Sequence, residues 1–472
     1  MSFDSLLYGV FLAAVLLAHR LLPWRFGRLA LLAASYFFYG YGSPWHCALL
    51  LAATALNFAA AIRLDAMALG RRRKAFLGAT IAASLGMLVA FKYGGFLATN
   101  LNALLALARL PAVPVPEIAF PAGISFYTFQ TLSYTIDVYY GKERPTRDFL
   151  GFALYVSFFP QLVAGPIERF SRLMPQLMEK RPVAARDVEL GFQRILWGLV
   201  KKTVIADRLA LYVDAVYRAP GEASGASLAV ATFCFAMQVY LDFSAYCDIA
   251  IGSARMIGVT LSENFRWPLL TRDPAELWTR WHITLSTWFR DYLFTALVGR
   301  KRPGPVRQLL NVVVVMVIAG LWHGASWHFV AYGFAAGVGI ACYEAIYLIS
   351  GRSRGRPLLG RGRAATVASM AGMHLFGLLL VILFRCQTLH DAGVVLRGIA
   401  RGPWAPDALA AAYGAAGVAI WLVVMARGRF FRDGRRDLEI PAPLRALLWM
   451  ALALAITYGA VDTRQQFIYF QF

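Results

Sequence analysis

The sequence predicts an all-α polytopic membrane protein, and three observations carry this prediction. Of the 472 residues, 59% are hydrophobic and only 15% are charged, which is too apolar for a soluble enzyme of this size. Apolar stretches close to the ~20 residues that a crossing needs recur along the whole chain. Basic clusters separate them, as the positive-inside rule describes. We expect about 11 to 13 membrane segments, some re-entrant or interfacial, in a single domain covering 1–472.

The basic residues indicate membrane topology and not nucleic-acid binding. The formal net charge is +21, but no basic run is interleaved with stacking aromatic residues in a soluble module. The basic loops at 63–74, 352–363 and 427–436 are instead assigned to the cytoplasm. The first apolar stretch lacks a basic leader and an Ala-x-Ala exit, so we expect it to be retained as the first span.

The predicted spans in the first half of the chain differ in length and in the charged residues that they contain. Predicted spans lie at 6–22, 29–42, 45–62, 76–93 and 120–138. Residues 149–164 are few and meet Gly165-Pro166, so this segment either crosses or is re-entrant. Segments at 189–215 and 228–252 form a further pair, although Lys201 and Lys202 make the first a poor lipid-facing helix.

The second half begins with residues 276–300, where aromatic and apolar residues recur at helical spacing. The pattern predicts one amphipathic helix along the cytoplasmic interface, beside Arg300–Arg302. A hairpin follows, with spans at 309–323 and 325–349 and a turn at 324–326. Spans at 367–384, 408–426 and 446–461 complete the set and leave the tail outside.

His323 is the residue in this sequence that most strongly indicates chemistry. No Asp, Glu, Lys or Arg occurs between Gln308 and Tyr343, so the imidazole lies within a membrane-embedded stretch and must be paired, solvated by a cavity or used in a reaction. A neutral imidazole takes a proton from a hydroxyl and returns it, which predicts a general base. His282 is the second candidate. The alternative is that each ring only donates to a helix carbonyl inside the bundle.

Other kinds of site find little support. His323 and His328 are five residues apart, unlike an i, i+4 metal pair, and we expect no metal site. The five cysteines are scattered, and neither a Gly-x-Ser-x-Gly elbow nor a Walker or Rossmann motif occurs. The remaining histidines, including His374, are expected near span ends. Polar bands at 123–134 and 238–244 either hold helices together or line a wet tunnel, with Asp242 and Asp248 as the candidates for a functional role.

Five ordered blocks together resemble the membrane-bound O-acyltransferase (MBOAT) family, most closely its members that acetylate bacterial alginate. The blocks read FPAGISFYTFQ at 120–130, FFPQLVAGPI at 158–167, DFSAYCD at 242–248, WHITLS at 281–286 and GLWHG at 320–324. The resemblance implies that His323 matches the essential intramembrane histidine of the family and that His282 matches its second active-site position. It also implies a ring of tilted helices around a central funnel.

The resemblance further implies a function. It indicates an acetyltransferase of the bacterial inner membrane that moves an acetyl group from a cytoplasmic thioester, acetyl-CoA, for O-acetylation of an exported polysaccharide such as alginate. No bound cofactor is implied. The expected partners are membrane lipid, a periplasmic acetyltransferase, the polysaccharide export machinery and the polysaccharide acceptor. Rival acceptors are peptidoglycan, cellulose and teichoic acid receiving D-alanine. Rivals of another class are a transporter, whose substrate would emerge unmodified, and a scaffold, in which both histidines would be dispensable.

Overall fold

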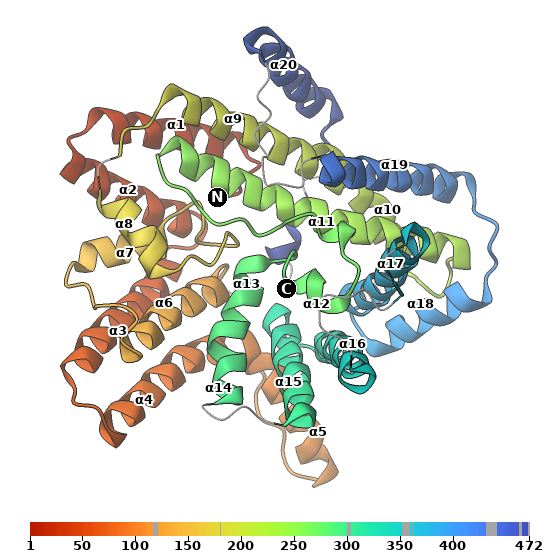
Figure 1. Cartoon of the computed structure of the whole chain (residues 1–472), viewed down its shortest axis with the longest axis horizontal. Coiled ribbons are helices and arrows are strands. Elements are labelled where there is room, and N and C mark those ends of the chain that lie inside the picture. Colours follow the sequence, from red (N-terminus) through yellow and green to blue (C-terminus); the bar gives the residue numbers. More distant parts are fainter. Residues whose placement is uncertain are drawn as a thin grey trace. The chain divides into compact units, whose positions relative to one another are not determined.

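The structure, a computed structural model, is helical throughout the part of the chain that it describes. It describes residues 1–116, 121–179, 181–299, 304–351, 359–360, 362–430, 441–461 and 465–470, and these ranges contain no strand (Figure 1). The all-α prediction is therefore confirmed. Most of the basic loop at 352–363, the second half of that at 427–436, and Arg300–Arg302 lie outside the described residues.

The helices form two compact units that share two long helical segments. Unit 1 comprises Met1–Ile195 with Tyr246–Ser262, and unit 2 comprises Leu196–Ala245 with Glu263–Phe472. Helices α9 (Ala185–Leu199) and α11 (Gly225–Met256) contribute residues to both units.

Unit 1 contains the first eight α-helices and the beginning of α9. They are α1 (Leu6–Leu21), α2 (Trp24–Gly40), α3 (His46–Ala66), α4 (Arg71–Leu88), α5 (Gly94–Leu107), α6 (Ile124–Tyr139), α7 (Phe149–Ser157) and α8 (Phe170–Met178). A π-helical turn, Val89–Tyr93, joins α4 to α5. Helix α7 rises only about 14 Å, about half the hydrocarbon thickness. It is too short to cross alone, which supports the re-entrant alternative for 149–164.

The polar band at 123–134 forms part of α6 and is buried within unit 1. The Gln130 side chain donates to the Tyr155 carbonyl at 2.9 Å, and the Thr131 hydroxyl donates to the Tyr127 carbonyl at 2.9 Å. Asp248 receives a 2.9 Å hydrogen bond from Arg194. The Thr131 bond stays within α6, but the Gln130 bond joins α6 to α7 and favours the interpretation in which the band holds helices together. The Arg194–Asp248 bond likewise joins α9 to α11.

Unit 2 contains the remaining helices. They are η2 (Val200–Ala206), α10 (Asp207–Arg218), η3 (Pro268–Leu270), α12 (Pro274–Trp278), α13 (Ile283–Trp288), η4 (Phe289–Phe294), α14 (Thr295–Val298), α15 (Pro305–His323), α16 (Trp327–Ser350), α17 (Arg363–Arg385), α18 (Leu389–Arg401), α19 (Ala408–Phe430), α20 (Ala442–Gly459) and η5 (Ile468–Phe470). The pair predicted at 189–215 and 228–252 corresponds to the nearly continuous run α9–η2–α10 and to α11.

The single amphipathic helix predicted at 276–300 is wrong. The chain breaks at 279–282, and His282 takes a left-handed backbone conformation with φ of 42°. The break is stabilised from elsewhere in the sequence: the Ile283 N–H donates to the Asn264 carbonyl and the Arg266 N–H donates to the Arg280 carbonyl, both at 2.9 Å. These nonlocal hydrogen bonds override the helical periodicity.

Among the described residues, seven helical segments are long and apolar enough to cross a membrane, which supports a multi-pass membrane protein. They are His46–Ala66, Arg71–Leu107, Gly225–Met256, Pro305–His323, Trp327–Ser350, Arg363–Arg385 and Ala408–Gly428. Helices α1 and α20 are apolar but shorter. The larger predicted number also counted segments that the structure shows as short or broken. Orientation and the ring around a funnel stay predictions.

Helices α15 and α16 form the predicted hairpin (Figure 1). Gly320 and Gly333 lie where the two backbones approach, and a Cβ on either glycine would overlap the backbone of the opposite helix. Such close approach through small residues is typical of helix pairs in membranes. The hairpin therefore fixes His323 at the C-terminal end of α15.

Candidate active site

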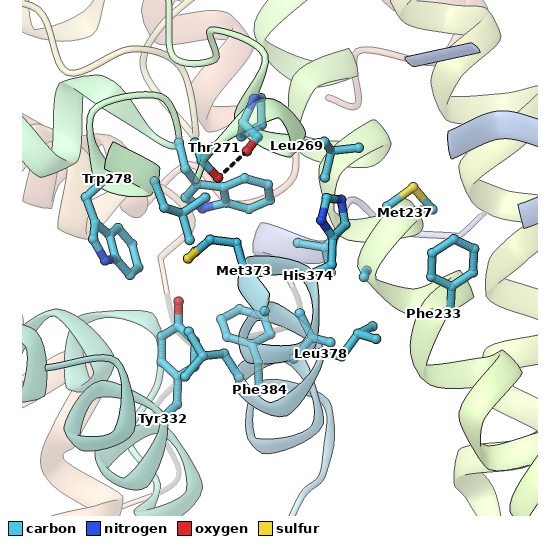
Figure 2. A pocket seen from close by; sticks show the side chains of 18 of the residues that line it. Phe233, Met237, Leu269, Thr271, Trp278, Tyr332, Met373, His374, Leu378 and Phe384 are labelled. Carbon is cyan, nitrogen blue, oxygen red and sulfur yellow. Dashed lines mark hydrogen bonds between the residues drawn. The ribbon is translucent and has the colours of Figure 1, made fainter. Parts of the chain in front are cut away.

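His323 lines a cavity inside unit 2. The cavity has a volume of about 160 Å³, and its walls come mainly from apolar side chains of α11, η3, α12 and α17. Figure 2 shows Tyr332 with its hydroxyl directed into this space, opposite Met373 and below Trp278. His323 is 7% exposed. The ring is therefore buried yet faces a space, as a reactive imidazole requires.

Aromatic rings from α15, α16, α17 and η5 surround His323. Its ring centroid lies 5.0 Å from that of Trp322, 5.2 Å from Phe384, and 5.9 Å from both Tyr332 and Tyr469. Large rigid rings restrict the orientation of the imidazole and keep bulk water away from it. The His323 ring is therefore held in a restricted orientation in weakly hydrated surroundings.

His282 reaches the same aromatic cluster from the broken segment. Its ring lies 4.7 Å from Phe243 and 5.8 Å from both Trp322 and Tyr469. Trp322 and Tyr469 thus contact both histidines, so the structure brings the two predicted site residues together. Burial, and secondly the nearby His323, lower the pKa of His282 well below its ordinary value. The imidazole is therefore neutral near pH 7, and its protonated form is disfavoured.

Tyr469 is a part of this site that the sequence prediction missed. It belongs to η5, near the C-terminus of the chain. We expected the tail only to lie outside the membrane and gave it no role. The aromatic residues Phe467 and Tyr469 just after the last apolar span were the available signal.

A buried ion network contacts the C-terminal segment 465–470. The ammonium group of Lys202 is 2.8 Å from Asp242 and 2.9 Å from Asp207, and all three side chains are buried. Asp242, singled out in the sequence as a membrane acid, is therefore part of an ion network and does not line the cavity. Its neighbour Phe243 carries the contact with His282.

Two other histidines have structural hydrogen bonds. The Trp421 indole N–H donates to His374 Nε2 at 3.0 Å, so the proton on Nδ1 is the one donated to the Met370 carbonyl at 2.7 Å. His374 lies within α17 and lines the cavity (Figure 2), so its predicted place near a span end is wrong. His328 contacts the Leu383 carbonyl through Nδ1 at 3.0 Å.

Neither a metal centre nor a disulfide is part of the described structure. No group of three or more His, Cys, Asp and Glu side chains that could hold a metal ion occurs among the described residues. All five cysteines are free thiols.

Comparison with known proteins identifies the family. The sequence model of MBOAT, the membrane-bound O-acyltransferase family, matches residues 142–385, a segment that contains both His282 and His323. The chain belongs to this family. It is accordingly an O-acyltransferase, and the resemblance drawn from the five motif blocks is confirmed. Tyr469 lies beyond the matched segment.

Three relatives illustrate the acceptors named for similar proteins. The chain is similar to the probable alginate O-acetylase of Azotobacter vinelandii, with 36% identity over 74% of this chain and 70% of the relative. A peptidoglycan O-acetyltransferase of Helicobacter pylori is 32% identical over 68% of this chain and 65% of the relative. A teichoic acid D-alanyltransferase of Streptococcus thermophilus is 30% identical over 47% and 56%, respectively.

Proposed function

We propose that this acyltransferase moves an acetyl group from a cytoplasmic thioester, acetyl-CoA, for O-acetylation of an exported polysaccharide, with alginate as the acceptor. Several probable alginate O-acetylases support the acceptor, at 33–36% identity over most of the chain. A multi-pass protein of the bacterial inner membrane fits a donor on one side and a polymer on the other. A periplasmic acetyltransferase and the export machinery are its proposed partners.

In the proposed reaction, His323 is the general base. Its neutral imidazole takes the proton from an acceptor hydroxyl or a relaying group, and the oxygen attacks the thioester carbonyl. The new C–O bond forms as the C–S bond breaks, and the proton passes to the leaving thiolate. His282 orients the thioester or relays this proton to its sulfur. The position of His323 on the wall of the cavity carries this proposal.

The exclusion of water is the contribution of the cavity walls. A thioester that met water beside an activated base would be hydrolysed, and a mostly apolar lining prevents that loss. The apolar surroundings that make an intramembrane histidine energetically unfavourable therefore also protect the thioester from hydrolysis.

The test is replacement of His323 with Ala in the full-length chain, expressed in cells that lack the native gene. Acetyl esters on the exported polymer are measured by mass spectrometry. We expect a loss of about 100-fold or more, the size of a general-base contribution. His328→Gln is the matched control, since His328 is equally buried but its ring faces the Leu383 carbonyl. Normal acetylation by the inserted His323→Ala protein would refute the role.

Peptidoglycan is the second candidate acceptor because a peptidoglycan O-acetyltransferase is among the relatives. The same cells distinguish the two acceptors. Acetyl esters that depend on His323 and occur on muramic acid, with none on the exported polysaccharide, would replace alginate by peptidoglycan and keep the mechanism.

A further inference from the structure

Asp242 uses its two carboxylate oxygens for two different purposes. Oδ1 lies 2.8 Å from the Lys202 ammonium, whereas Oδ2 accepts the backbone N–H of Ile468 at 2.8 Å. Ile468 is 226 residues further along the chain and begins η5. A carboxylate buried in α11 therefore holds the backbone of the C-terminal segment 465–470.

Lys202 also contacts the same segment. Its ammonium lies 4.5 Å from the ring centroid of Phe467, a cation–π contact. Ile468 and Phe467 are each 2% exposed. The segment is thus held by one backbone hydrogen bond, one cation–π contact and burial of its apolar side chains.

The anchored segment carries Tyr469 into the site. The Tyr469 ring centroid lies 4.0 Å from Phe243, the residue after Asp242, and within 5.8 to 5.9 Å of both histidine rings. One turn of α11 therefore supplies both the anchor of the segment and an aromatic contact for Tyr469 and His282. A shift of the Ile468 backbone would move a ring that contacts both histidines.

From this geometry we infer that Asp242 is a positioning residue, which anchors the C-terminal segment so that Tyr469 keeps its place against His282 and His323. This inference rests on the proposed function of the two histidines. Removing one partner of a buried ion pair is destabilising in itself, so the test needs a control variant that breaks an ion pair to the same lysine and keeps the Ile468 hydrogen bond.

The chain offers a matched pair of variants for the test. Asp242→Asn and Asp207→Asn each remove one negative charge from the same lysine, but only Asp242 bonds Ile468. An amide has a single oxygen acceptor, so the Asp242→Asn side chain loses either the lysine or the Ile468 N–H. We expect Asp242→Asn to lower kcat by ~10- to 100-fold, because displacement of a site by about 1 Å has effects of this size, with KM changed less than about threefold. Asp207→Asn should keep kcat within about threefold of wild type.

A second measurement reports on the segment itself, independently of catalysis. Ile468→Cys is introduced with Cys342→Ser, which removes an exposed thiol, and maleimide labelling of the C-terminal peptide is followed by mass spectrometry. We expect labelling at least about tenfold faster with Asp242→Asn than with Asp207→Asn, as a released segment exposes a buried position. Equal labelling rates, or faster labelling with unchanged kcat, would overturn the inference. Activity retained by His323→Ala would instead overturn the proposed function, while the labelling result would still report the anchor.

Discussion

The two histidines are held in place by different kinds of structure. His323 ends a regular helix, and the α15–α16 hairpin that fixes it is formed by neighbouring segments through glycine contacts. His282 lies in an irregular break, held by residues 264–266 and by contact with the C-terminal Tyr469. The first arrangement is local and the second depends on distant parts of the chain. This difference decides both what a mutation costs and what a sequence can predict.

The hairpin should be the more sensitive of the two to added volume. Gly333→Val would place side-chain atoms against the Met316 backbone of α15, and we expect a destabilisation of about 1 to 3 kcal/mol or more, with loss of folded protein. Yield and thermal stability in detergent, read by size-exclusion chromatography, measure it. Gly372→Ala in α17 is the control, because nothing lies near its Cβ. A Gly333→Val protein as stable as wild type would show that the close packing does not hold the hairpin.

The same contrast explains which parts of the fold were predictable. The hairpin followed from an uncharged run interrupted by Gly324-Ala325-Ser326, and its partner in space is its neighbour in sequence. The stripe from Trp278 to Tyr292 had a helical period but did not form one helix, because the backbone of 264–266 pairs with the break. Periodicity records which residues are buried and does not record such pairing.

The candidate site, like the fold, was only partly predictable from the sequence. His323 and His282 were identifiable because an imidazole in an apolar or motif-bearing stretch is unusual, whereas Tyr469 is one aromatic residue among many in this chain. Only the fold brings it against the histidines. Asp242 was recognised as an unusual membrane acid, but its lysine and backbone partners are 40 and 226 residues away. No local pattern contains that information.

Asn264 allows the nonlocal arrangement to be weakened directly. Its side-chain oxygen accepts hydrogen bonds from the Thr284 N–H at 3.1 Å and the Thr284 hydroxyl at 2.7 Å. Asn264→Ala should cost about 1 to 3 kcal/mol, since it leaves buried donors without this acceptor. The variant should also lower the rate of acetyl transfer by more than the loss of folded protein explains, because His282 is two residues from Thr284. The measurement is the acetyl-transfer activity at a temperature well below the melting temperature of the variant.

A helix cap elsewhere in unit 2 provides the comparison for Asn264. Thr388 caps α18 by accepting the Asp391 N–H at 3.1 Å, and Thr388→Ala should cost ~1 kcal/mol without contact with either histidine. If both variants lose activity only in proportion to stability, the 264–284 contact supports the fold and does not position His282.

The smallest expected effect is a dependence of stability on pH that comes from His282. Burial lowers the pKa of this imidazole in the folded chain, while an unfolded histidine titrates near pH ~6.5. Below about pH 6.5 the unfolded chain binds a proton at this histidine, whereas the folded chain does not. The free energy of unfolding therefore falls as the pH is lowered below ~6.5, and it does not change above that pH. The slope contributed by one group is at most about 1.4 kcal/mol per pH unit.

Thermal melts of the detergent-solubilised protein between pH 5 and 8 should therefore show a steeper loss of stability toward acid pH in wild type than in His282→Asn. Parallel curves for the two proteins would mean that the break at 279–282 admits a protonated imidazole, and that the nonlocal contacts do not keep water from His282.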